Sequence, residues 1–319
     1  MARKTSTKKA RQAETAGEPA SRKTGKMKPE PLRAEIGILG GTGLYEIEGI
    51  HDLKEVSITT PWGKPSDEFI LGTLEGRRVA FLSRHGRGHR FSPSEINYRA
   101  NVYGFKMLGV DRLISVNSVG SLREHIRPRD IVFADQFIDK TKRACTFFGE
   151  GCVAHISFGD PVCPQLSRHC HKVAGELGIR SHLGATYVCM EGPAFSTRAE
   201  SKMHQIWGGD LIGMTAATEA KLFREAEICY TTMNLATDYD SWRPQDEGVT
   251  VGMIFENLRE NISKAKAIIR KALATLPDHD DAACHCRHVL AAAVVTAAKH
   301  VPAATRKKLA LFVPEYRVR

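Results

Sequence analysis

The sequence predicts a single α/β domain whose central mixed, largely parallel β-sheet is flanked by helices. Short apolar runs alternate along the chain with longer stretches of helical periodicity, which is typical of a sheet covered on both faces. Small polar residues and glycines follow several of these runs, as they do at the carboxyl ends of strands in α/β proteins. No fixed-period repeat is visible, which argues against a solenoid.

The first 33 residues are predicted to be a disordered basic tail. They contain ten Lys and Arg against three Glu and almost no aliphatic residues, so they cannot bury enough apolar surface to offset the entropy of ordering. They also lack the apolar stretch of a signal peptide or membrane anchor, so we expect a cytoplasmic protein.

The net charge of +10 belongs to the two ends of the chain. Residues 1–33 sum to +7 and residues 284–319 to +6, which leaves −3 for residues 34–283. Such basic runs are most often solvated. A minority hypothesis is that they bind RNA or other acidic partners.

The predicted catalytic domain covers residues 34–277 and opens with a strand over residues 35–39. Further strands are predicted at 69–71, 79–83, 113–116, 131–134, 187–190, 211–214 and 228–236. Helices are predicted at 95–108, 165–177, 198–207, 218–225 and 251–276. Residues 278–319 are predicted to form a C-terminal extension, with a helix from about Cys284 to His300 and then a basic tail.

The eight cysteines are too sparse for a disulfide scaffold, and none forms a Cys-x-x-Cys pair. The sequence therefore predicts no metal site. The closely spaced Cys284 and Cys286 are either a redox couple or two ordinary thiols. The second reading is favoured because cytosolic disulfides are uncommon.

Glycines and anion-binding side chains follow three predicted strands. The turn Gly40-Gly41-Thr42-Gly43 lets backbone N–H groups approach a phosphate closely, although alone it is as often a plain tight turn. Arg84 and His85 follow the strand 79–83, where an Arg can hold a phosphate through two parallel bonds. Asn117 and Ser118 follow the strand 113–116. Met214 and Thr215 stand in the same way at the end of the strand 211–214. We expect these strand ends to form one anion site.

Two carboxylates, Asp238 and Asp240, follow the apolar strand 228–236. Seen alone, an Asp in this position is more often a turn or cap residue. Beside a phosphate site, however, a carboxylic acid with a raised pKa can protonate a departing purine at N7. Phosphate is then the nucleophile, so no Ser, Cys or Lys nucleophile is needed. We predict phosphorolysis of a nucleoside, with Asp238 as the acid.

Together these motifs resemble the 5′-methylthioadenosine phosphorylases, within the trimeric purine nucleoside phosphorylase superfamily. The resemblance runs from about Glu35 to Leu276. The motifs that carry it are Ile36-Gly37-Ile38-Leu39-Gly40-Gly41-Thr42-Gly43-Leu44, Thr60-Pro61-Trp62-Gly63-Lys64-Pro65-Ser66, Arg84-His85-Gly86-Arg87, Asn97-Tyr98-Arg99-Ala100-Asn101, Glu191-Gly192-Pro193-Ala194-Phe195-Ser196-Thr197-Arg198-Ala199-Glu200 and Thr237-Asp238-Tyr239-Asp240.

The resemblance implies a role for each matching residue. Phosphate would be bound by Thr42, Arg84, His85, Asn117, Ser118 and Thr215. Met214 would lie against the ribose and Phe195 beside the purine, with Asp238 and Asp240 at its N7 and 6-amino edge. The apolar pocket for the methylthio group would be lined by His155, Val251, Ile254 and Phe255. It also implies a homotrimer that takes inorganic phosphate as co-substrate and needs no metal or organic cofactor.

Base specificity is predicted from two positions. Relatives that use 6-oxopurines typically have Asn where Asp238 stands, whereas the amino group of adenine is a donor and needs an acceptor. Ser196 agrees, because those relatives tend to have Glu there. We therefore predict phosphorolysis of S-methyl-5′-thioadenosine, in methionine and purine salvage. The alternative is a broader purine nucleoside phosphorylase that acts on adenosine or inosine.

Overall fold

The computed structural model describes residues 1–2, 32–41, 44, 47–243, 251–279 and 284–316, and for 251–255 it describes the helix but not the side chains. The predicted basic tail at 1–33 therefore lies almost entirely outside the described residues, as does Thr42. Residues 32–319 form one compact unit.

The strands agree with the predicted ones to within a few residues at their starts, and three more are present. They are β1 (Ile36–Gly40), β2 (His51–Val56), β3 (Phe69–Leu74), β4 (Arg77–Ser83), β5 (Arg112–Ser121), β6 (Ile131–Ala134), β7 (Gln136–Asp139), β8 (Ser181–Leu183), β9 (Thr186–Cys189), β10 (Leu211–Gly213) and β11 (Cys229–Asp238).

The five helices predicted for the domain are also confirmed. They are α1 (Tyr98–Met107), α2 (Pro164–Glu176), α3 (Arg198–Ile206), α4 (Ala216–Glu225) and α5 (Val251–Ala274), and a short α6 (Ala303–Leu309) follows near the C-terminus. Among the described residues, no helix is both long and apolar enough to cross a membrane.

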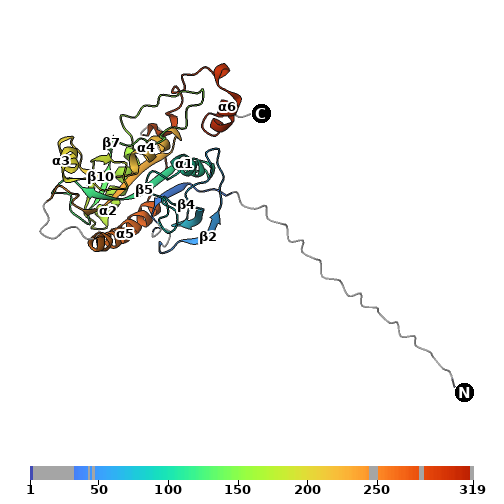
Figure 1. Cartoon of the computed structure of the whole chain (residues 1–319). Helices are drawn as coiled ribbons and strands as arrows, with labels where there is room; N and C mark the ends of the chain where they lie inside the picture. Colours follow the sequence, from blue (N-terminus) through green and yellow to red (C-terminus); the bar gives the residue numbers. More distant parts are fainter. Residues whose placement is uncertain (3–31, 42–43, 45–46, 244–250, 280–283, 317–319) are drawn as a thin grey trace. The chain divides into compact units, whose positions relative to one another are not determined.

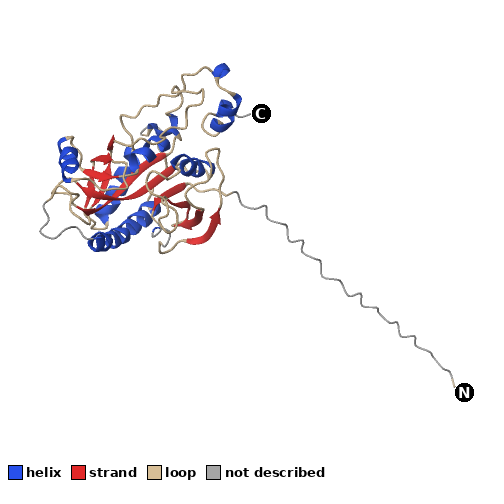
Figure 2. Cartoon of the chain, viewed as in Figure 1, coloured by secondary structure: helices blue, strands red, loops and turns tan. Residues whose placement is uncertain are grey.

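All these strands join one mixed sheet, with the path β2-β3-β4-β1-β5-β10-β9-β7 and with β11, β6 and β8 branching from β5. The central pairs β4-β1, β1-β5 and β5-β11 are parallel, whereas β2-β3, β3-β4, β5-β10 and β6-β11 are antiparallel. This confirms the predicted mixed, largely parallel sheet (Figure 2).

Helices cover both faces of this sheet (Figure 1). On one face, α1 and α4 pack against alternate strand residues such as Leu39 and Leu82. On the other, α2 and α5 pack against Ile38 and Phe81. Because successive side chains of a strand point to opposite faces, an apolar run buried throughout, such as Ile36–Gly40, indicates two covering layers.

The predicted end of the strand at 113–116 is wrong. β5 continues through Asn117 and Ser118 to Ser121, because β11 pairs with it in parallel as far as Gly120 and β10 pairs with Gly120 and Ser121. Its neighbour β1 stops at Gly40. Asn117 and Ser118 thus lie within a strand, at the point where that strand extends beyond its neighbour.

The predicted helix at 284–300 is also wrong. This segment contains two short 3₁₀ turns, His285–His288 and Ala298–His300. Its alanine-rich part instead pairs with Val153–His155, through His155 N–H to the Ala293 carbonyl and Val295 N–H to the Val153 carbonyl. Tertiary pairing has outweighed the helix propensity of alanine.

The C-terminal extension packs onto the domain rather than standing apart from it. Phe312 lies against Trp62 and Phe147, with ring centroids 6.4 and 4.4 Å apart, and Cys284 and Cys286 belong to the core beneath α2 and α5.

Candidate active site

A pocket of about 1030 Å³ opens where β4 ends and where β5 and β11 continue past it, beside the end of β10, which runs antiparallel to β5. It brings together ten of the predicted site residues: Arg84, His85, Asn117, Ser118, Phe195, Ser196, Met214, Thr215, Asp238 and Asp240. Arg84 and Asp240 are more than 150 residues apart in the sequence. They lie close together because β4 and β11 are parallel strands of one sheet, and the carboxyl ends of parallel strands share one edge.

Arg84 is buried directly after β4 and forms a two-pronged ion pair with Glu219 of α4. It also donates to Ser115 Oγ at 2.7 Å and to the Val116 carbonyl at 3.1 Å. Burial by itself would lower the pKa of Arg84, but the Glu219 carboxylate raises it above its ordinary value. An arginine has five N–H donors. Four of them bond to other protein atoms. To donate two hydrogen bonds to phosphate, Arg84 would have to give up one of these four.

His85 is held as a neutral imidazole. Its Nδ1 lies 2.8 Å from the Phe91 carbonyl, which can only accept, so Nδ1 carries the proton. Burial, followed by the charge of Arg84, lowers the pKa of His85 to about 4. Its Nε2 is consequently an acceptor at neutral pH, suited to the hydroxyl of a hydrogen phosphate ion.

Thr215 stands at the N-cap of α4, between the end of β10 and the helix. Its hydroxyl donates to Asn117 Oδ1 at 3.0 Å, and Asn117 Nδ2 in turn donates to Thr232 Oγ1 at 2.7 Å. The amide of Asn117 therefore orients Thr215 and is itself engaged within the protein. The first N–H groups of a helix and its dipole favour an anion, so this end of the pocket suits phosphate.

Asp238 ends β11, after a bulge at Thr237. Its Oδ1 accepts from Asp240 N at 2.9 Å and its Oδ2 from Thr237 Oγ1 at 2.7 Å. Burial raises the pKa of Asp238 above its ordinary value, although these two hydrogen bonds oppose the shift. The net shift is in the direction that a proton donor requires.

Asp240 lies in the turn after β11 with φ of 26°. Burial raises the pKa of Asp240, with the Ser201 and Ser196 hydroxyls close enough to oppose the shift. Even so, among the described residues none makes a well-formed hydrogen bond to its buried Oδ2. Because this oxygen is inaccessible as it stands, a ligand N–H reaches it only if the Asp240 side chain turns toward the pocket.

The remaining pocket residues lie on the loop before α3 and after β10. Ser196 is buried, and the next residue starts a capping box in which Thr197 and Glu200 bond each other's backbone N–H groups. Phe195 is 74% exposed, so its ring stands at the mouth of the pocket. Met214 packs against Gly192, where an added Cβ would lie 2.5 Å from its sulfur.

Four predicted residues lie outside what the structure describes: Thr42 entirely, and the side chains of Val251, Ile254 and Phe255. His155 is described and is not brought to the pocket. It is exposed on the segment that pairs with residues 293–295.

Two residues that position the site were missed from the sequence. Glu219 pairs with Arg84 across 135 positions, and its place among the alanines of α4 gives no signal of that partner. Arg143 is nearly buried and donates to the carbonyls of Met214 and Glu191 and, at 2.9 Å, to Tyr98 Oη. It fixes the backbone on which Met214 stands.

The pocket therefore has an anion-binding end, formed by Arg84, His85 and the start of α4, and an acidic end at Asp238 and Asp240. One end can hold a phosphate nucleophile while the other donates a proton to a leaving group. In the described part of the chain, no nucleophilic serine or cysteine with an adjacent histidine base lines the pocket.

Comparison with known proteins gives a consistent result. Residues 35–274 match the model of the phosphorylase superfamily. Two curated S-methyl-5′-thioadenosine phosphorylases, from Koribacter versatilis and Geobacter sulfurreducens, are 53% and 52% identical over 89% and 88% of this chain and 97% and 98% of their own.

Solved structures agree. A methylthioadenosine phosphorylase from an Antarctic soil metagenomic library is 43% identical with a TM-score of 0.84, covering 89% of this chain and 100% of its own. A methylthioadenosine phosphorylase from Schistosoma mansoni in complex with adenine is 31% identical with a TM-score of 0.77, covering 82% of this chain and 99% of its own.

Proposed function

The chain belongs to the phosphorylase superfamily, and on that premise we propose that it converts S-methyl-5′-thioadenosine and phosphate into adenine and S-methyl-5-thio-α-D-ribose 1-phosphate. It is a pentosyltransferase. The observation that carries the proposal is the pocket in which an anion site and two half-buried aspartates face one ligand-sized space.

In the proposed reaction, phosphate attacks the C1′ carbon of the ribose while the bond from C1′ to N9 of the purine breaks. Thr215, the start of α4 and the charge of Arg84 hold the phosphate. His85 Nε2 accepts a hydrogen bond from the phosphate hydroxyl, because Nδ1–H is engaged with the Phe91 carbonyl. The bond's electrons pass into the purine as it leaves.

Asp238 supplies the proton that the departing purine takes at N7. Burial raises its pKa, which makes it a better match for a proton donor than an exposed carboxyl would be. Asp240 Oδ2 accepts from the 6-amino group, which provides the donor that this oxygen needs. A 6-oxopurine would instead place an oxygen against it, at a cost of about 1 to 3 kcal/mol.

The proposal extends to a homotrimer. His155 is predicted to contact the 5′ group but is exposed and lies outside the pocket of its own chain. If it serves the site, it serves that of a neighbouring subunit. Sedimentation or light scattering should then give about three times the 35.2 kDa chain mass. A monomeric mass for the active enzyme would overturn this part.

We also propose that the enzyme works in the cytoplasm, in the salvage of methionine and purines. The enzyme takes inorganic phosphate as co-substrate and forms a sugar phosphate, and both are metabolites of the cytoplasm. The reaction itself uses no organic cofactor, since phosphate provides the attacking oxygen.

Substrate choice is tested by comparing the release of free base from three nucleosides at saturating phosphate. We expect adenine to be released fastest from S-methyl-5′-thioadenosine, more slowly from adenosine, and hypoxanthine slowest from inosine. Faster cleavage of inosine would contradict the reading of Asp238 and Asp240 and favour the broader nucleoside phosphorylase.

A further inference from the structure

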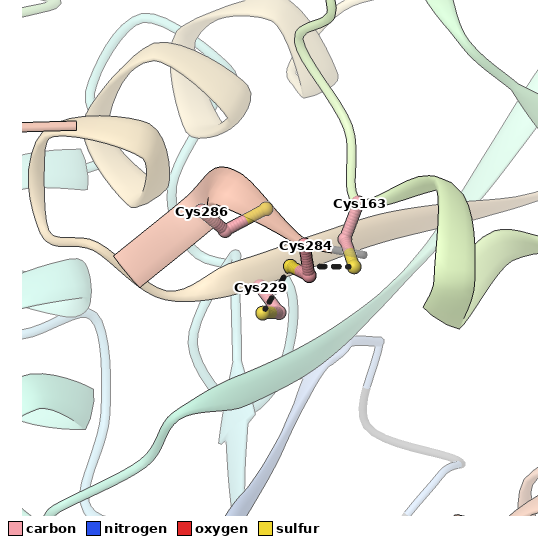
Figure 3. A group of neighbouring side chains, drawn as sticks. All are labelled: Cys163, Cys229, Cys284 and Cys286. Atoms are coloured by element: carbon pink, nitrogen blue, oxygen red, sulfur yellow. Dashed lines mark hydrogen bonds between the residues drawn. The ribbon is translucent and has the colours of Figure 1, made fainter. Parts of the chain in front are cut away.

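Four cysteines from three separate segments of the chain meet in the core (Figure 3), and none of them lines the pocket. Cys163 is the N-cap of α2, Cys229 begins β11, and Cys284 and Cys286 belong to the 3₁₀ turn of the C-terminal extension. All four are buried and none is in a disulfide. The spacing of neighbouring cysteines predicted no zinc site, whereas this cluster is assembled by the fold.

The distances between the sulfurs fit a tetrahedron around one ion. All four Sγ atoms lie within 4.8 Å of one another, with Cys229–Cys284 at 3.4 Å and Cys163–Cys284 at 3.6 Å. With zinc–sulfur bonds of about 2.3 Å, the edge of a regular ZnS₄ tetrahedron is about 3.8 Å. A disulfide needs about 2.05 Å. The cluster already has the size of the first arrangement.

The surroundings of the cluster favour negative charge. Arg224 is 8% exposed, and its Nη1 donates to Cys286 Sγ at 3.3 Å. Its Nε is buried without a hydrogen-bond partner, and no described carboxylate forms an ion pair with it. A buried guanidinium needs a compensating anion. Thiolates beside it would provide that anion, whereas neutral thiols would not.

Two further groups face the sulfurs. His279 Nε2 lies 3.3 Å from Cys229 Sγ, and Cys163 stands at the N-terminus of α2, where the helix dipole favours a thiolate. Metal-bound thiolates commonly accept such second hydrogen bonds. The cluster thus has four sulfur ligands and three groups that stabilise their charge.

We propose that Cys163, Cys229, Cys284 and Cys286 bind one Zn²⁺ ion in a closed tetrahedral site that fastens the C-terminal extension to the domain. Four thiols give up four protons, the ion binds the four thiolates, and the site carries a net charge of −2 opposite Arg224. With every ligand position taken by sulfur, the ion has a structural role.

The site lies apart from the chemistry. Cys229 begins β11 and Asp238 ends it, and at about 3.3 Å per residue these positions are roughly 30 Å apart. The proposal is therefore independent of the proposed function. Loss of zinc is expected to weaken the hold on the C-terminal extension without removing any group that contacts the nucleoside.

The test measures metal content by mass spectrometry on the full chain, produced with added zinc and freed of loose metal by gel filtration. We expect roughly one zinc ion per chain, and loss of that ion in Cys284→Ser. Cys170→Ser is the matched control, because Cys170 is fully buried in α2 and is not one of the four. It should retain the zinc.

A second measurement keeps the proposal testable if Cys284→Ser fails to fold. The wild-type chain, stripped of metal by a chelator under reducing conditions, is titrated with Co²⁺. Thiolate-to-cobalt absorption that saturates at about one equivalent and disappears when Zn²⁺ is added would support the site. Absence of this absorption would overturn it.

The competing reading is a pair of disulfides among the same cysteines. Each would lower the mass of the intact chain by two hydrogens and remove two of the eight thiols. Finding these bonds in protein purified under anaerobic conditions, without zinc, would contradict the proposal. Finding eight thiols and no retained zinc would contradict it equally.

Discussion

Replacing Asp238 by Asn tests the proposed acid with little disturbance of the fold. Thr237 Oγ1 lies 2.7 Å from Asp238 Oδ2 and 3.2 Å from the Val119 carbonyl. In the variant the Asn amide can donate to Thr237 Oγ1, whose own proton turns to Val119, while the Asn oxygen keeps the bond from Asp240 N. No buried donor or acceptor is left unpaired, so we expect the melting temperature to change little.

The variant nevertheless loses the transferable proton. Positioned general acids typically contribute about 10² to 10⁴ in rate, which corresponds to roughly 3 to 5.5 kcal/mol of the activation barrier. We expect kcat/KM for S-methyl-5′-thioadenosine to fall by a factor in that range, and inosine to gain relative to it, since an amide can donate to a 6-oxo group.

The assay is initial-rate release of base at saturating phosphate, with thermal unfolding measured on the same samples. Asp240→Asn is the matched comparison, because it alters the 6-amino contact and leaves the acid in place. Its transition state for S-methyl-5′-thioadenosine should be less stable by about 1 to 3 kcal/mol, read from the fall in kcat/KM. Undiminished turnover by a folded Asp238→Asn variant would refute the role given to Asp238.

Three other predictions concern titratable side chains that are buried or half-buried. Glu219→Gln leaves Arg84 without its counter-ion, so urea unfolding should show a loss of about 3 to 5 kcal/mol. Burial raises the pKa of Glu225 from 4.5 to about 7, so between these two pH values the folded state binds more protons than the unfolded state. Stability should then fall by about 3 kcal/mol as pH rises through this range and level off above, and Glu225→Gln should remove the slope. His85→Ala should raise the KM for phosphate by roughly tenfold, the worth of one hydrogen bond.

Each of these has a control or a contrary result. Glu176→Gln removes an exposed partner of Lys271 and should lower the free energy of unfolding by under about 1 kcal/mol. If Glu219→Gln lowered it by no more than that, the buried ion pair with Arg84 would not stabilise the fold as stated. A flat pH dependence of wild-type stability between pH 5 and 7 would contradict the account of Glu225. An unchanged KM for phosphate would remove His85 from the anion site.

Much of the fold follows from local pattern. Strands such as β1 and β4 are continuous apolar runs buried on both faces, and the polar residues after them could be assigned to one edge because parallel strands end together. By contrast, β2 is exposed at five of its six residues and carries charged side chains, so its sequence resembles a loop. Only pairing with β3 makes it a strand.

What the sequence missed depends on partners far along the chain. The alanine-rich segment before Ala298 favours a helix locally but pairs with Val153–His155. The end of β5 was misplaced because Asn117 and Ser118 are polar, although β11 supports them as strand residues. Glu219 and the four cysteines acquire their roles only when distant segments meet, which no spacing along the chain records.

The dependence of base release on phosphate tests the central claim most directly. The protein is incubated with S-methyl-5′-thioadenosine with and without inorganic phosphate, and both adenine and the sugar product are quantified. The account predicts adenine release only with phosphate, matched mole for mole by S-methyl-5-thioribose 1-phosphate. Adenine release at the same rate without phosphate, with free S-methyl-5-thioribose as product, would mean that water is the nucleophile and would contradict the anion site assigned to Arg84, His85 and Thr215.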